Sequence, residues 1–169
     1  MAAIKQIPLS VLLSFPPPNY EDPETHGDGL VIVNSIFIAL VTICVALRLY
    51  TRLFIKRWFG IDDWFIILAW IFTMATDILV IVANQNYYWD RHIWDIPLSD
   101  SAGNLKVALA STILFTCAAS STRISLVCFY YRLVREVKRP LFRWALHLTL
   151  GYCVAVWITF VFTSCLQCV

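Results

Sequence analysis

Charged residues are scarce in this chain. Asp, Glu, Lys and Arg make up 14% of its 169 residues, whereas a soluble domain carries about 25%. Hydrophobic residues account for 60%, and so little polar surface cannot cover a globule of this size in water. The formal net charge of only +2 gives no indication of a nucleic-acid partner. The composition therefore predicts that a lipid bilayer covers the apolar surface.

Proline is missing from four long apolar runs, in which ionisable residues are also rare. These runs are residues 30–47, 64–83, 107–131 and 144–165. A helix needs about 20 apolar residues to cross a bilayer core, where its backbone groups must bond internally. The runs do not alternate apolar with polar residues, which excludes barrel strands. We predict an all-α membrane protein with four transmembrane helices, at about 30–50, 64–84, 106–132 and 144–165.

The third run is also rich in small residues, which let membrane helices approach each other closely. Alanine and serine occupy much of its length: Ala108, Ala110, Ser111, Ala118, Ala119, Ser120, Ser121 and Ser125. We predict that this helix is the central packing helix.

Basic residues gather in two of the loops, and this gives the chain an orientation. Nine lie between the first two runs or between the last two: Arg48, Arg52, Lys56, Arg57, Arg132, Arg135, Lys138, Arg139 and Arg143. The N-terminal tail and the 84–106 loop together hold only Lys5, Arg91 and Lys106. The positive-inside rule then predicts that the N-terminus is extracytoplasmic. The protein is expected in the plasma membrane or an endomembrane. Residues 1–29 are expected to be an outer, proline-rich tail before a transmembrane domain at 30–169.

Motifs for catalysis or cofactor binding are missing. The sequence has no phosphate-binding loop, no Gly-x-Ser-x-Gly elbow and no His-Glu-x-x-His. His26, His92 and His147 share no metal-ligand spacing. No lysine lies within an apolar run, which excludes a retinal Schiff base in the bundle. The sequence predicts no cofactor and no metal, and it favours a protein that is not an enzyme.

Most of the six cysteines lie inside apolar runs, where a thiol behaves as a small hydrophobic group. Cys165 and Cys168 differ because they lie at the end of the fourth run. They could form a disulfide or remain as two thiols. A redox motif would need a thioredoxin-like context, which the sequence does not have.

Charged side chains inside or beside the apolar runs are candidate functional residues, because charge is costly in a membrane. Arg123 could reach the inner face by snorkelling, could pair with Asp77, Asp62 or Asp63, or could face a ligand. Asp62 and Asp63 follow Gly60 and could cap the second helix, with a paired-carboxylate site as the alternative. His92 lies in the outer loop and could face water or a ligand.

Three short stretches have a specific order and spacing between the predicted helices. They are Arg48-Leu-Tyr-Thr-Arg52 through Gly60-Ile-Asp62-Asp63-Trp64, then Arg91-His92-Ile-Trp94-Asp95, and finally Thr122-Arg123-Ile-Ser125-Leu126 through Tyr130-Tyr131-Arg132. Together they resemble the fungal rhodopsin-domain family of integral membrane proteins. The chain departs from that family at Tyr88 and Asp90, where the family tends to have glycines, and at Arg123, where it tends to have lysine.

The resemblance implies the first half of a seven-helix bundle, so the chain is expected to be truncated after its fourth helix. It implies a receptor-like protein, or an accessory protein of a fungal secondary-metabolite gene cluster, with Arg48, Arg52 and Arg132 in structural or signalling roles. The expected partners are the bilayer, other membrane proteins or a second copy, and a small lipophilic ligand. The alternatives are a cyclase-like enzyme that uses Asp62, Asp63 or Asp77 as proton donor, and a non-functional remnant.

Overall fold

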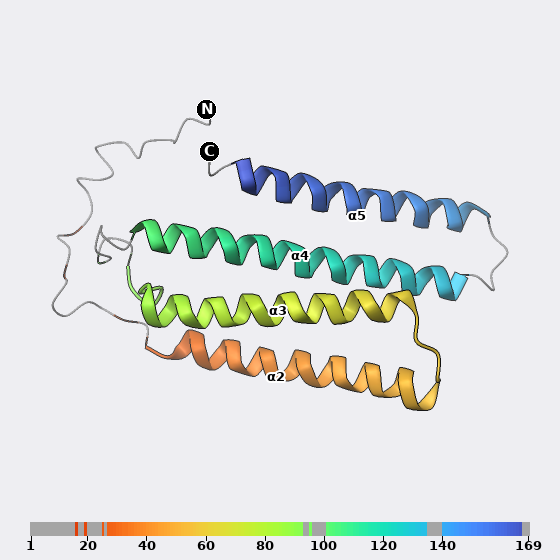
Figure 1. Cartoon of the computed structure of the whole chain (residues 1–169), viewed down its shortest axis with the longest axis horizontal. Helices are drawn as coiled ribbons and strands as arrows, with labels where there is room; N and C mark the ends of the chain where they lie inside the picture. Colours follow the sequence, from red (N-terminus) through yellow and green to blue (C-terminus); the bar gives the residue numbers. More distant parts are fainter. Residues whose placement is uncertain are drawn as a thin grey trace.

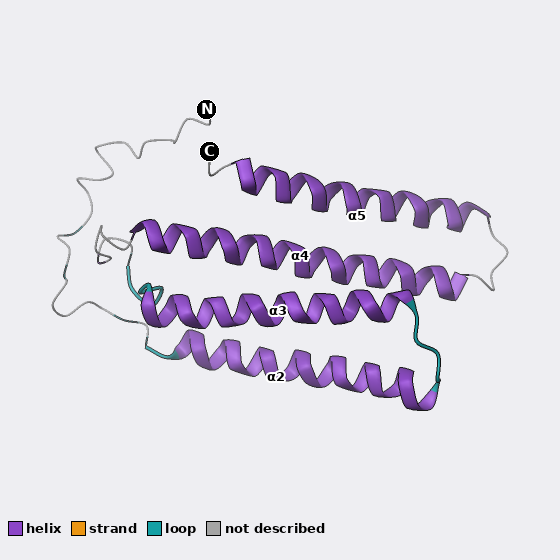
Figure 2. Ribbon diagram, viewed as in Figure 1, coloured by secondary structure: helices purple, strands orange, loops and turns teal. Residues whose placement is uncertain are grey.

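The computed structural model describes residues 16, 19, 25, 27–92, 95, 101–134 and 140–166. Its elements are α2 (Gly29–Tyr50), the π-helical turn η1 (Thr51–Ile55), α3 (Ile61–Asn86), α4 (Ser101–Val134) and α5 (Pro140–Leu166) (Figures 1 and 2). Four helices, the first of them α2 continued by η1, are long and apolar enough to cross a membrane. In these ranges the only extended pairing is an isolated bridge between Thr25 and Arg91. The prediction of an all-α membrane fold with four spanning helices is confirmed.

The four helices run up and down, and each packs against the next one in the chain (Figure 1). Helix α4 lies between α3 and α5, and 33% of its most apolar stretch is buried, compared with 6% or less in the other three. Its buried residues include small ones that allow this close approach: Ser111, Ala118, Ser120, Ser121 and Ser125. Helix α4 is therefore the central packing helix, as predicted.

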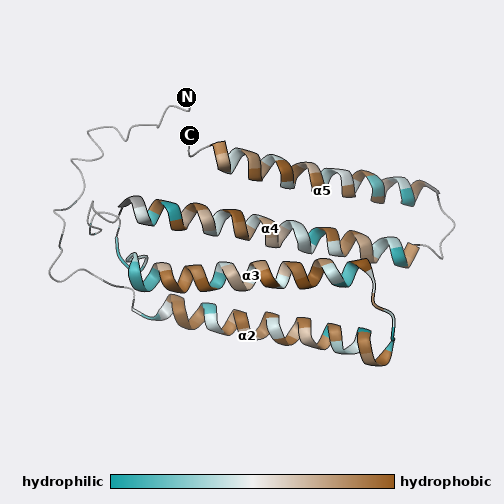
Figure 3. Ribbon diagram, viewed as in Figure 1, coloured by the Kyte–Doolittle hydropathy of each residue, from teal (hydrophilic) through white to brown (hydrophobic). Residues whose placement is uncertain are grey.

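Large apolar side chains are exposed on all four helices, and hydrophobic residues, drawn brown in Figure 3, make up much of each helix. Ile78 on α3, Phe115 on α4 and Phe162 on α5 are all more than half exposed. Exposing such surface to water costs roughly 25 cal/mol per Å², and a bilayer removes that cost. The protein is an integral, multi-pass membrane protein whose partner on these faces is lipid.

Three helices begin earlier than the apolar runs predict, among them α5, which begins at Pro140 instead of residue 144. Helix α3 begins at Ile61 instead of residue 64, because Asp63 caps its first turn. Helix α4 begins at Ser101 instead of 106, and Asn104 in its first turns accepts a hydrogen bond from Trp89 Nε1. Apolar runs mark only the lipid core, whereas a helix continues wherever polar partners satisfy its ends. Lys106 therefore lies inside α4, with an exposed side chain, and not at its edge.

The turn after α3 forms although it has Tyr88 and Asp90 at the positions where the family that the sequence resembles tends to have glycines. Tyr88 takes a φ of 58°, the left-handed region that favours glycine. The Arg91 guanidinium stacks over the Tyr88 ring at 4.4 Å. Gly103 on α4 packs so closely against Tyr87 that a Cβ there would lie 2.6 Å from the ring. Stacking and close helix packing thus hold a turn in which tyrosine replaces glycine.

Candidate functional site

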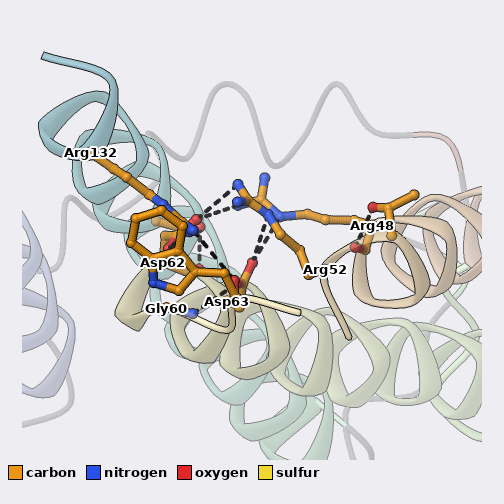
Figure 4. A network of polar contacts seen from close by, with 9 residues as sticks. Arg48, Arg52, Gly60, Asp62, Asp63 and Arg132 are labelled. Carbon is orange, nitrogen blue, oxygen red and sulfur yellow. Dashed lines mark hydrogen bonds and ion pairs between the residues drawn. The ribbon is translucent and has the colours of Figure 1, made fainter. Parts of the chain in front are cut away.

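Five charged side chains from three consecutive helical segments meet at one end of the bundle (Figure 4). We call the end formed by residues 48–63, 129–134 and 140–147 the basic end. The arginine–aspartate network at this end consists of Arg48, Arg52, Asp62, Asp63 and Arg132. Arg48 lies in the last turn of α2 and Arg52 in η1. Their spacing of four residues places both on the side of α2 that faces the start of α3.

Asp62 is the residue that joins all three segments. Its Oδ2 lies 3.1 Å from Arg48 Nη2 and 3.4 Å from Arg52 Nη2. Its Oδ1 lies 3.6 Å from Arg132 Nη1 on α4. Ser125 Oγ, also on α4, donates a 2.7 Å hydrogen bond to the Asp62 carbonyl oxygen. Both the side chain and the backbone of Asp62 therefore tie the start of α3 to α4.

Asp63 is fully buried, with 0% of its surface exposed. Its Oδ2 accepts a 3.0 Å hydrogen bond from the Gly60 N–H and so caps α3, which confirms the capping prediction for this residue. Its Oδ1 faces Arg48 Nε at 3.5 Å and Arg52 Nε at 3.7 Å. These longer ion pairs leave Asp63 Oδ1 without a hydrogen bond.

Two aromatic rings support the guanidinium groups. Arg48 and Arg52 lie over the Phe129 ring, 5.9 and 5.7 Å from its centroid. Arg132 stacks over Trp58 at 4.0 Å and donates a 3.4 Å hydrogen bond to the Trp58 carbonyl. Such cation–π contacts contribute about 0.5–2 kcal/mol each. Sequence reasoning missed both rings in this role, because neither is close in sequence to all the arginines that it supports.

The chain turns sharply between the two halves of the network. The backbone of η1 continues into Lys56 N–Thr51 O and Trp58 N–Arg52 O hydrogen bonds of 2.9 and 3.2 Å. Arg57 then adopts a φ of 46°, which reverses the chain toward Gly60. A Cβ on Gly60 would overlap the Asp62 carboxylate, so this position requires glycine for space.

A cavity of about 1360 Å³ opens beside the network. We call it the basic groove. Its lining comes from the α2–α3 connection, the start of α3, the end of α4 and the start of α5: Arg52, Lys56, Trp58, Gly60, Ile61, Asp62, Cys128, Phe129, Tyr131, Arg132, Leu133, Val134, Arg143 and His147. On the α5 side, Tyr131 and His147 join α4 to α5 through a 2.6 Å contact between the hydroxyl and Nδ1.

The profile of the fungal rhodopsin domain matches residues 47–169, which include the whole network and the groove. The chain belongs to the fungal rhodopsin domain family. No curated protein and no solved structure gives a match. Two of the three stretches that carry the resemblance, Arg48 to Trp64 and Thr122 to Arg132, contribute all five residues of the network. In this fungal rhodopsin-domain protein the two stretches therefore meet in space.

Two of the membrane-embedded candidates lie apart from the network of this fungal rhodopsin-domain protein. Arg123 is exposed on α4 and forms no ion pair with any described residue. Asp77 is half-buried on α3, where its carbonyl oxygen accepts a 3.1 Å hydrogen bond from Asn34 Nδ2. Its carboxylate likewise has no ion-pair partner in the described part of the chain. The aspartates at the start of α3 pair with arginines of the helix ends, and Arg123 is not among them.

The third stretch of the family resemblance lies at the opposite end of the bundle. Arg91 forms the bridge with Thr25, and the buried Asp95 accepts a 2.9 Å hydrogen bond from the Asn19 N–H. The His92 carbonyl accepts from the Asp95 N–H at 3.0 Å. Across the residues that the structure describes, no group of three His, Cys, Asp or Glu side chains is placed to hold a metal.

The predicted disulfide of this fungal rhodopsin-domain protein stays a prediction. Cys165 is exposed near the end of α5, whereas Cys168 lies outside the described residues. Most of the 1–29 tail and the basic residues Arg135, Lys138 and Arg139 also lie outside them.

Proposed function

We propose that this protein is receptor-like and not catalytic, and that it transmits a change in helix packing to its basic loops. The observation that carries the proposal is the arginine–aspartate network. A single residue, Asp62, holds the ends of α2 and α4 against the start of α3. Any movement of one of these helix ends relative to the others must change those contacts. In this proposal the network is the element whose two arrangements would couple distant sites, as such coupling requires.

Orientation is the first part of the proposal: the N-terminus lies outside the cytoplasm and the basic end lies inside it. Charge supports this assignment, because the positive-inside rule counts Lys and Arg in short loops. Nine basic residues are predicted to lie on the inner side of the membrane. The six of them that the structure describes all lie at the basic end: Arg48, Arg52, Lys56, Arg57, Arg132 and Arg143.

Glycosylation mapping tests the orientation. The chain has no natural Asn-x-Ser/Thr acceptor, so every modification reports an introduced site. One flexible insert that carries an acceptor is placed at residue 20 in one variant and between residues 135 and 139 in another. We expect modification of the first variant only. Modification of the second variant alone would reverse the topology.

The structure also bears on the alternative of a cyclase-like enzyme. The carboxylate oxygens of Asp62 and Asp63 face three guanidinium groups and a backbone N–H, which leaves them poorly placed to protonate a substrate. Asp77 has no such partners among the described residues, so an enzyme would depend on Asp77. That dependence makes the two functions separable.

Deletion and complementation in the source fungus distinguish them. We expect the deletion strain to keep its metabolite profile, to respond differently to surface cues, and to be restored by both the wild-type chain and Asp77→Asn. Asp62→Asn should fail to restore the response while it still reaches the membrane. A deletion strain that accumulates an uncyclised precursor, cured by wild type and not by Asp77→Asn, would replace the receptor proposal with the enzyme. An accessory role in a metabolite gene cluster would require the same accumulation without dependence on Asp77.

A further inference from the structure

We propose that the basic groove binds the phosphate headgroup of an anionic membrane lipid. Four cationic side chains line the groove, and the only carboxylate among the lining residues belongs to Asp62. The cations are Arg52, Lys56, Arg132 and Arg143. Basic pockets between the ends of transmembrane helices suit phosphorylated lipid headgroups. This inference does not depend on the receptor-like role proposed above.

The network beside the groove has more positive than negative charge. Three guanidinium groups share two carboxylates, so the ion pairs leave one positive charge uncompensated. Arg132 shows the same imbalance at the atomic level, because its Nη1 is buried without a hydrogen-bond acceptor and lies 3.6 Å from Asp62 Oδ1. A buried charged donor without an acceptor is costly. A phosphate bound in the groove would supply the negative charge that the network lacks.

Two of the four cations that line the groove have exposed side chains. Lys56 extends from the α2–α3 connection, and Arg143 lies in the first turn of α5. Neither forms an ion pair with a described residue. The two side chains come from different segments, the α2–α3 connection and α5, and both line the groove.

Apolar residues at the same groove favour a lipid over a free phosphate compound. Ile61 is 70% exposed, Leu133 is 60% exposed and Trp58 is 62% exposed, and all three line the groove. Tryptophan at a helix end is typical of the membrane interface. A ligand with phosphate at one end and acyl chains at the other matches cationic and apolar side chains placed together. A soluble phosphate would leave the apolar part uncovered.

The experiment uses the full chain, purified in a non-ionic detergent, and measures binding by thermophoresis. The probes are dioctanoyl phosphatidylinositol phosphate, dioctanoyl phosphatidylcholine and the soluble inositol bisphosphate. The test variant is the double substitution Lys56→Gln and Arg143→Gln, which leaves the arginine–aspartate network intact. The matched control is Arg57→Gln with Lys106→Gln, which removes the same charge from exposed residues that do not line the groove.

We expect the wild-type chain and the control variant to bind the phosphoinositide and neither to bind the phosphatidylcholine. The test variant should bind about 10- to 30-fold more weakly, as expected for two basic side chains near a headgroup. Equal loss in both double variants would show diffuse attraction to charge and would overturn the groove as the site. Inositol bisphosphate binding as tightly as the lipid would overturn the lipid assignment in favour of a free phosphorylated compound.

Discussion

Replacing Asp63 with asparagine tests whether the network stabilises the fold. Asparagine has nearly the same shape, and its side-chain oxygen can still accept the hydrogen bond from the Gly60 N–H that now measures 3.0 Å. Its amide group would then replace Oδ1, which faces Arg48 Nε at 3.5 Å and Arg52 Nε at 3.7 Å. Donors would face donors, and three guanidinium groups would share the single carboxylate of Asp62.

The expected cost follows from burial. Removing one partner of a fully buried ion pair costs about 3–5 kcal/mol. Asp63 is fully buried, but the Arg48 and Arg52 side chains retain 28% and 11% exposure, so solvent screens part of the loss. We therefore expect Asp63→Asn to lower the free energy of unfolding by about 2–3 kcal/mol. Asp63→Ala should cost about 1 kcal/mol more, because it also removes the cap.

Thermal unfolding in detergent, followed with a thiol-reactive dye, measures this loss. Cys117, Cys128 and Cys153 are partly buried within the helices, so the dye reports their greater exposure as the bundle opens. A cost of 2–3 kcal/mol corresponds to a fall in Tm of roughly 5–10 °C. The matched control is Asp77→Asn, on the same helix but without an ion pair to any described residue. If Asp63→Asn and Asp77→Asn shift Tm equally, the network does not stabilise the bundle and the reasoning is wrong.

Two further substitutions probe the same region by the same assay. Gly60→Ala should lower Tm by several degrees, because its Cβ would displace the Asp62 carboxylate. The control Gly151→Ala should leave Tm unchanged or raise it, because nothing lies within 4 Å of that position and alanine favours a helix by about 1 kcal/mol. Equal shifts in Tm would contradict the steric argument. Ser125→Ala should cost about 1 kcal/mol through its lost hydrogen bond to the Asp62 carbonyl. Thr112→Ala, which removes an exposed bond within α4, should cost less, and a larger effect at Thr112 would refute this ranking.

Sequence alone predicts the spanning helices well, because the hydropathy of the runs and the need for internal backbone hydrogen bonds both favour helix. It predicts the helix ends less well. Residues such as Asp62, Asp63 and Asn104 are polar, and they lie within helices only because specific partners satisfy them. The role of Asp63 as a cap was predictable, since Gly60 and Asp63 have the spacing that capping requires.

The ion-pair partners were not predictable from the runs. From the sequence alone, Asp62 and Asp63 could pair with Arg123, because a charged side chain inside an apolar run is expected to need a partner. In the structure their partners are Arg48, Arg52 and Arg132. The partners Arg48 and Arg132 are 84 residues apart in the sequence numbering, and only the antiparallel packing of α2, α3 and α4 brings them to one place. The available signal was the four-residue spacing of Arg48 and Arg52, which places two cations on one helix face.

The packing of each helix against its neighbour in the chain has a consequence for biogenesis. A chain whose contacts are between consecutive helices can assemble in the order of its synthesis. Arg48 and Arg52 can meet Asp62 and Asp63 as soon as α3 enters the bilayer, because all four lie on the first helical hairpin. Arg132 emerges later and completes the network from the far end of α4. The ion pair between Arg132 and Asp62 would then form last in the network and fix α4 against the helical hairpin that was inserted before it.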